Sequence, residues 1–247
     1  QARANGELSH LLNNGLEAAL VSFGSGLIII LLITPFNPHI KEGITNLREA
    51  VARKEIAKWK LLAGALGGSF VAIQTQVVPL IGVAIYSVAS IAGQTAMSLI
   101  VDRIGLTGGG KKLISPRRIS AAFITVLAVL VSVLDRINAN NVSKFAVVGG
   151  CVAGALVGFR SALNGEINEH SHQSFTTSLL NFITGTTFLI ILMAGGLLLG
   201  KIHFSALPTG PWWIYTGGVL GVVYIAFIST IVQHLGVLTF TLFSVGG

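Results

Sequence analysis

The sequence predicts an all-α integral membrane protein with two inverted-topology repeats of five transmembrane helices, here truncated at both ends. Only 10% of its 247 residues are charged, compared with about 25% in a soluble globular domain, so lipid must cover much of its surface. Several uncharged runs reach the roughly 18 residues that cross about 30 Å of hydrocarbon as a helix. These runs lack the alternation of β-barrel strands. An internal repeat, described below, predicts the two halves.

The positive charge is concentrated in two loops. Of the 16 Lys and Arg residues, 11 lie in residues 41–60 and 103–118, as the positive-inside rule predicts for cytoplasmic loops. We therefore interpret 37–58 and 102–118 as basic cytoplasmic loops, and the net charge of +7 does not indicate a nucleic-acid partner. The single cysteine, Cys151, excludes an internal disulfide and a cysteine-based metal site. Neither a metal nor a cofactor is predicted.

The chain begins with a polar segment, residues 1–15, which we interpret as the end of a preceding helix and a short external loop. The first span, 16–36, ends at the proline pair Pro35 and Pro38, because proline cannot continue a helix. Residues 39–58 carry charges three to four apart, which is typical of an amphipathic surface helix.

The remaining spans follow from the long apolar runs and from their boundary residues. One opens at an interfacial Trp59 and the next at Pro79, as expected for a membrane interface and a helix start. The spans are predicted at 59–76, 79–101, 118–134, 145–163, 174–199, 213–231 and 234–247. Polar or Gly- and Pro-rich loops at 105–116, 135–143 and 201–211 separate some of them.

Two stretches of the chain recur later with constant offsets. With an offset of 159 the matches are Asn5-Gly6-Glu7 with Asn164-Gly165-Glu166, Leu20 with Leu179, Phe23 with Phe182, and Gly26 with Gly185. With an offset of 154 they are Trp59 with Trp213, Gly64 with Gly218, Gly67 with Gly221, Gly82-Val83 with Gly236-Val237, and Gly93 with Gly247. We interpret both Asn-Gly-Glu segments as turns, with Glu7 and Glu166 solvated.

Five predicted spans separate the two Asn-Gly-Glu segments, so these segments are expected on opposite sides of the membrane. The half-repeats are predicted at 1–136 and 143–247, and loop 200–212 has only Lys201, as an external loop should. Inverted repeats are typical of secondary transporters, whose substrate site lies near the midplane between the halves.

Several motifs resemble a known family. QARANGELS at the start is similar to the QAxxNxxL pattern of the YdcZ-like, EamA-related branch of the drug/metabolite transporter superfamily. SFGSG at 22–26, GALGG at 64–68 and the GQTAMSLIVDRIGL…SPRR run at 93–118 resemble it too. The resemblance implies ten helices, five plus five, in a bacterial inner membrane. On that pattern the chain lacks the first helix and the last one and a half.

Two charged residues stand out within the apolar runs. Arg160 interrupts an apolar run, where an arginine costs roughly 2.5–3.5 kcal/mol at the bilayer centre. It is either an anion-attracting cavity group or a cation snorkelling to the cytoplasmic interface. Glu17 is either a carboxylate favoured by a helix N-terminus or a proton-coupling group.

Uncharged polar residues at membrane depth complete the predicted cavity. Each could instead hydrogen-bond between helices. The full set of substrate-cavity candidates is Glu17, Gln74, Tyr86, Ser87, Ser90, Gln94, Arg160, Asn164, Asn181, Thr184, Tyr224, His234 and Ser244. Small residues predicted to allow close helix packing are Gly64, Gly67, Gly82, Gly93, Gly218, Gly221 and Gly236.

The predicted function is secondary transport of a small metabolite or drug across the bacterial inner membrane, in the export direction, by alternating access. The expected partners are the lipid bilayer and a small-molecule substrate, and protons as coupling ions and a homodimer stay open. A non-transporting scaffold or a half-subunit of a paired assembly is the first alternative. An intramembrane enzyme is disfavoured, because HExxH, paired intramembrane aspartates and a Ser-Lys dyad are absent from the sequence.

Overall fold

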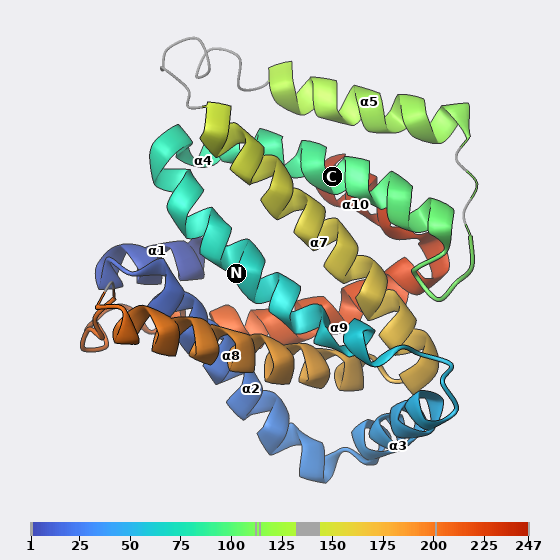
Figure 1. Ribbon diagram of the computed structural model, residues 1–247, viewed down its shortest axis with the longest axis horizontal. Helices are drawn as coiled ribbons and strands as arrows, with labels where there is room; N and C mark the ends of the chain where they lie inside the picture. Colours follow the sequence, from blue (N-terminus) through green and yellow to red (C-terminus); the bar gives the residue numbers. More distant parts are fainter. Residues whose placement is uncertain (1, 112, 114, 132–143, 201, 247) are drawn as a thin grey trace. The chain divides into compact units, whose positions relative to one another are not determined.

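All regular elements in the described part of the chain are helices. The computed structural model describes residues 2–111, 113, 115–131, 144–200 and 202–246. Its α-helices (Figure 1) are α1 (Ala2–Leu12), α2 (Gly15–Ile33), α3 (Pro38–Ala52), α4 (Ala63–Ile104), α5 (Pro116–Val131), α7 (Lys144–Ser171), α8 (Ser174–Leu198), α9 (Gly217–Leu235) and α10 (Val237–Gly246). Short 3₁₀ helices are η1 (Thr34–Phe36), η2 (Lys58–Leu62) and η3 (Trp212–Tyr215).

The long apolar helices confirm the predicted class, an all-α membrane protein. Within the described residues, six segments are long and apolar enough to cross a membrane: Gly15–Phe36, Lys58–Val78, Leu80–Ile104, Lys144–Ser171, Ser174–Leu198 and Gly217–Leu235. The spans predicted at 16–36 and 174–199 match the structure to within about a turn. Residues 132–143, which contain the predicted end of span 118–134 and loop 135–143, lie outside the described residues, as do Gln1 and Gly247.

The two spans predicted at 59–76 and 79–101 correspond to the candidate spans Lys58–Val78 and Leu80–Ile104, which divide at Pro79 as predicted. Helix α4 continues through this point, and its backbone leaves the helical conformation at Gly82, with φ 75° and ψ 159°. This conformation is essentially restricted to glycine. Among the described residues outside its own stretch of helix, no atom lies within 4 Å of the position that a Cβ of Gly82 would take. Backbone conformation therefore explains this glycine, and the helix packing predicted for it does not.

The two predicted Asn-Gly-Glu turns are wrong, because both segments are helical. Asn5 to Glu7 lie in α1, and Asn164 to Glu166 lie in α7, which continues to Ser171. Asn and Gly are poor helix formers, but this part of α7 is buried, with Ile167 fully covered. Glu166 is buried as well, contrary to the solvated position predicted for it. Burial overrides the local preference here.

The backbone repeats itself at the positions that the sequence offsets pair. Each predicted turn lies further along the chain, at Asn13 (φ 49°) and at His172 (φ 55°), which are related by the offset of 159. Asn14 and Gln173 then serve as the N-caps of α2 and α8. With the offset of 154, η2 corresponds to η3, and both precede a helix that is interrupted at a glycine with positive φ. These glycines are Gly82 (φ 75°) and Gly236 (φ 84°).

The chain forms two compact units, and each draws on both halves of the sequence. Unit 1 consists of Gln1–Ala72 and His170–Phe227, and unit 2 consists of Ile73–Glu169 and Ile228–Gly247. The half-repeats at 1–136 and 143–247 are a different division and stay a prediction.

Within unit 1, α2 and α8 pack against each other (Figure 1). Equivalent residues of the two repeats make reciprocal contacts in this packing. The ring of Phe182 covers Gly26, and the ring of Phe23 covers Gly185. The two rings lie 5.4 Å apart between centroids. Since Phe23 is equivalent to Phe182 and Gly26 to Gly185, the contact has the self-complementary form of a two-fold interface.

The first turns of α4 and α9 in unit 1 also make reciprocal contacts through equivalent residues. Gly64 lies against the backbone of Asn181 and Gly185 and the hydroxyl of Thr184. Gly218, its equivalent, lies against the matching atoms one repeat earlier: the carbonyl of Ser22, the amide of Gly26 and the hydroxyl of Ser25. Gly64 and Gly218, for which packing roles are predicted, thus lie at close backbone approaches, while Gly67 and Gly221 are buried.

The contacts at the two ends of the α2–α8 pair show in which direction each of these equivalent helices runs. The turn before α2 lies beside the 202–215 segment, where the Ser205 amide donates to Glu17 and Ile214 packs with Leu12. The equivalent turn before α8 lies beside α3, which follows the other end of α2; there Asn46 Nδ2 donates to the Ser171 carbonyl over 3.3 Å. Equivalent turns therefore lie at opposite ends of the α2–α8 pair.

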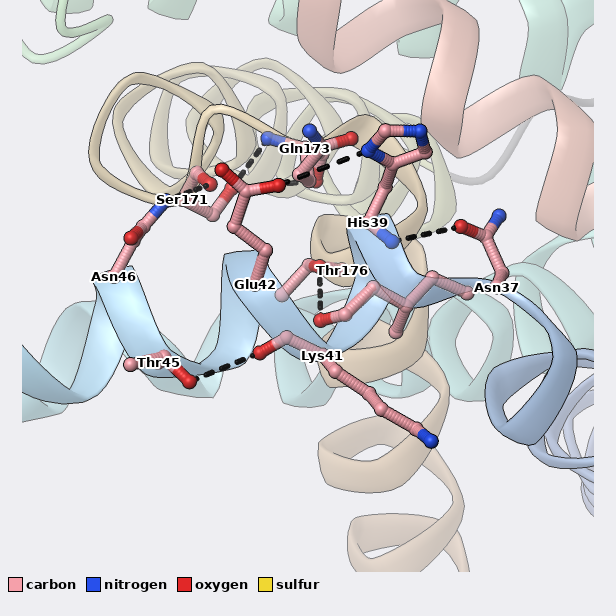
Figure 2. A network of polar contacts seen from close by, with 10 residues as sticks. Asn37, His39, Lys41, Glu42, Thr45, Asn46, Ser171, Gln173 and Thr176 are labelled. Carbon is pink, nitrogen blue, oxygen red and sulfur yellow. Dashed lines mark hydrogen bonds and ion pairs between the residues drawn. The ribbon is translucent and has the colours of Figure 1, made fainter.

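Helix α3 is amphipathic and packs on the start of α8 (Figure 2). Its buried face consists of Ile40, Gly43, Leu47 and Ala50. Thr176 Oγ1 donates to the Ile40 carbonyl over 3.2 Å, and a Cβ at Gly43 would meet Thr176 and Gln173. The amphipathic helix predicted in 39–58 is present as α3 over Pro38–Ala52, and part of its apolar face is covered by protein; its place on the membrane surface stays a prediction.

In unit 2, α4 and α7 cross at small residues. A Cβ at Gly93 would overlap the Cys151 carbonyl, and one at Gly154 would overlap the Ser90 carbonyl. These contacts bring the two backbones together, as small residues do in membrane helix pairs. Further along, Val101, Ala162, Val232 and Val237 form a buried apolar cluster that joins α4, α7, α9 and α10.

Candidate functional site

Glu17 lies in the first turn of α2 and is 4% exposed. The Asn14 side chain caps this turn by accepting from the amides of Leu16 and Glu17, both over 3.2 Å. The Glu17 carboxylate accepts from the Ser205 amide over 3.2 and 3.3 Å and from Asn14 Nδ2 over 3.4 Å. The carboxylate is thus held at a helix N-terminus, where the dipole favours its charge, and it binds the 202–211 segment.

Asn181 and Thr184, also in unit 1, lie on the face of α8 that meets Gly64. Asn181 Nδ2 donates to the Thr177 carbonyl over 3.0 Å, and Thr184 Oγ1 donates to the Leu180 carbonyl over 2.8 Å. Both side chains bond to their own helix, so these contacts fit the packing interpretation as well as the cavity interpretation.

In the described part of unit 2, polar side chains bond between helices at several places, first between α4 and α10. Gln94 Nε2 donates to Thr241 Oγ1 over 3.2 Å. The Ser98 hydroxyl lies 3.2 Å from the same Thr241 oxygen and also donates to the Gln94 carbonyl over 2.6 Å. Ser98 and Thr241 are fully buried. The structure therefore brings the predicted Gln94 together with two hydroxyls that the sequence did not single out.

One turn further along α4, Asp102 caps the N-terminus of α10. Its two carboxylate oxygens accept from the Val237 amide over 2.8 Å and the Leu238 amide over 3.1 Å. Asp102 is 0% exposed and lies at the end of its own helix, where the dipole disfavours a negative charge. The amide groups of α10 compensate for this placement. Gly236 leaves room for the carboxylate, since its Cβ would lie 2.8 Å from Asp102 Oδ2.

The end of α7 supplies a third polar group. Asn168 Nδ2 donates to Gln233 Oε1 over 2.6 Å, and Gln233 Nε2 donates to Glu169. Nearby, Gly165 lies against the backbone of Thr107 and Gln233. We name the set Gln94, Ser98, Asp102, Asn168, Glu169, Gln233 and Thr241 the polar seam of unit 2.

The other predicted residues are distributed over both units. Asn164 is buried and Arg160 half-buried on α7, and Tyr86 is buried and Gln74 half-buried on α4. Ser87 donates to the Val83 carbonyl over 2.8 Å, and the Ser90 carbonyl lies at the Gly154 crossing. Tyr224, His234 and Ser244 are exposed, and His234 Nδ1 lies 2.8 Å from the Thr230 carbonyl.

The seam offers hydrogen-bond donors and acceptors, with carboxylates at Asp102 and Glu169. Such groups suit a polar ligand or the transfer of a proton. Among the described residues, no group of three or more His, Cys, Asp or Glu side chains could hold a metal ion. Sequence reasoning passed over Asp102 because it stands at a helix end. Its partner amides are 135 and 136 residues away, and the only visible signal was a carboxylate inside an apolar run.

Comparison with known proteins gives one match. A family model described as "Putative inner membrane exporter, YdcZ" matches residues 1–131 and 145–247. No curated protein and no solved structure matches the chain.

Proposed function

Because the chain belongs to the YdcZ family of inner membrane exporters, we propose that it is a secondary transporter that exports a small metabolite or drug by alternating access. The observation that carries this proposal is the exchanged contact in unit 1, where Phe23 covers Gly185 and Phe182 covers Gly26. A two-fold contact between equivalent helices that run in opposite directions is what inverted repeats require. Transporters of this architecture switch access by moving one repeat or bundle against the other.

Within unit 2, the proposed substrate contacts are the polar seam and the predicted cavity residues that this unit contains. Gln94 is the strongest candidate, because it is half-buried and its amide group reaches across from α4 to α10. Hydrogen bonds between membrane helices contribute only about 0.6 kcal/mol on average. A polar ligand can therefore replace such a bond at little cost, which suits a site that must bind and release.

The first experiment measures flux in proteoliposomes with and without a pH gradient, for a panel of cationic drugs and small metabolites. If protons drive export through Glu17, the Glu17→Gln variant should lose roughly tenfold or more of the gradient-driven flux, since its amide group cannot carry the proton. The matched control is Glu7→Gln, which makes the same chemical change at an exposed position on α1 and should transport normally.

Each result of this experiment has a defined meaning. Flux that is independent of the gradient and unchanged in Glu17→Gln would identify a facilitator and leave Glu17 as a structural group that binds Ser205. Absence of flux for every compound, with the protein shown to be folded, would support the scaffold interpretation. Flux lost equally in Glu7→Gln would exclude a specific role of Glu17.

A further inference from the structure

Helix α3 connects two candidate membrane spans. It lies between the end of the first span and the start of the second. The span Gly15–Phe36 precedes it and the span Lys58–Val78 follows it. Phe36 is 87% exposed and Trp59 is 52% exposed, and aromatic side chains at span ends favour the headgroup layer. The position of α3 is therefore the membrane–water interface.

The charged side chains of α3 are separated by sign around the helix. Lys41 and Arg48 are seven residues apart, or nearly two turns, so they share one flank. Glu42 and Glu49 are also seven residues apart and lie about 100° further round. Arg53 lies near the two glutamates, because it follows Glu49 by about one turn.

Two acidic side chains of this segment, Glu49 and Glu55, pair with Arg53, and the third, Glu42, lies beside a histidine. Glu42 lies 3.7 Å from His39 Nδ1, and Glu49 lies 3.2 Å from Arg53 Nη2. Glu55 lies 3.5 Å from Arg53 Nε. Lys41 and Arg48 are exposed and take part in none of the ion pairs found among the described residues. The shared flank thus carries two positive charges that pair with no carboxylate in the described part of the chain.

Figure 2 shows which way each flank points. Glu42, Asn46 and His39 extend towards the turn at Ser171 and Gln173, on the outer side of α3. Lys41 leaves α3 on the other side, along the direction in which α8 continues from Thr176. Because α8 is a candidate membrane span, this direction leads from the turn into the lipid. Lys41 and Arg48 therefore face the headgroup layer.

We propose that the Lys41–Arg48 flank of α3 is a binding surface for the phosphate groups of anionic phospholipid headgroups. A basic side chain near an anionic membrane surface contributes about 1 kcal/mol. The long stems of Lys41 and Arg48 place the charges at the phosphates, while the half-buried Ile44 beside them packs on the core of unit 1. The surface would anchor this end of unit 1 to the charged leaflet.

The test measures binding of phosphatidylglycerol and of phosphatidylcholine to the purified full chain in neutral detergent, by native mass spectrometry. The wild-type chain should bind phosphatidylglycerol more tightly. Each of Lys41→Gln and Arg48→Gln should weaken that binding by roughly fivefold and leave phosphatidylcholine binding unchanged. The matched control is Arg53→Gln, which removes an equal charge from the outer side of α3 and should leave lipid preference unaltered.

Three results would overturn the proposal. The first is equal affinity of the wild-type chain for both lipids. The second is a loss in Arg53→Gln as large as that in Arg48→Gln, which would indicate net charge alone. The third is full competition by soluble glycerol phosphate at lipid-like concentrations, which would identify a free-anion site. Equal melting temperatures of the variants in lipid-free detergent exclude misfolding as the cause of any difference.

Discussion

Alanine at Gly218 is expected to destabilise the protein severely, and alanine at Gly64 is expected to do so to a similar extent. In each case the new Cβ would overlap backbone atoms of the neighbouring helix: the Ser22 carbonyl and Gly26 amide for Gly218, and the Asn181 carbonyl and Gly185 amide for Gly64. Backbone cannot rotate away as a side chain can. The cost should reach or exceed the upper end of the roughly 1–3 kcal/mol typical of overpacking. Thermal unfolding in detergent measures it.

The control for this experiment is Gly24→Ala. Gly24 stands in α2 two residues from Gly26, and no atom of the described residues beyond its own stretch of helix lies within 4 Å of its Cβ position. Alanine there should be neutral or should stabilise the helix by up to about 1 kcal/mol. A melting temperature of Gly218→Ala equal to that of Gly24→Ala would contradict the packing of unit 1. A large difference between Gly64→Ala and Gly218→Ala would contradict its two-fold relation.

Removal of the Asp102 carboxylate should release the start of α10. Asp102→Ala leaves the amides of Val237 and Leu238 without their acceptor in a fully buried position. Each buried group that loses its partner costs about 1–3 kcal/mol, so the melting temperature should fall strongly. Hydrogen exchange at these two amides should accelerate by the largest factor in the chain.

Asp102→Asn provides the graded comparison, because the amide oxygen still accepts one bond while the charge is lost. Its effect should be intermediate between those of the wild type and Asp102→Ala. If Val237 and Leu238 exchange at wild-type rates in Asp102→Ala, the cap does not hold α10, and the role assigned to Asp102 is refuted.

The sequence was sufficient for the features that depend on local composition. Long apolar runs predict spans such as α2 and α8, because only a helix satisfies its own backbone in lipid. The repeat offsets correctly paired positions that share an unusual backbone, such as Gly82 with Gly236. The predicted division into two spans at Pro79 is confirmed, but the sequence did not show that the backbone of α4 leaves the helical conformation a few residues later, at Gly82.

Features that depend on distant partners could not be predicted. The offset shows that Phe23 is equivalent to Phe182, but equivalence does not reveal that the two rings touch. Likewise, Asn-Gly-Glu at 164–166 has the composition of a turn, but it lies inside α7, where Asn164 and Glu166 are buried. The candidate residues of the cavity remain predictions. The structure adds the polar partners Ser98, Thr241 and Gln233, whose positions follow from tertiary packing alone.

The exchange of phenylalanines between α2 and α8 also constrains how the protein is made. Phe23 and Gly26 leave the ribosome well before Phe182 and Gly185, which are encoded 159 residues later. Until α8 is synthesised and inserted, the α2 side of this contact can meet only lipid or other nascent helices. Assembly of unit 1 must therefore wait for the second repeat. Quality control during biosynthesis would then encounter an inserted but unassembled first repeat as the normal intermediate.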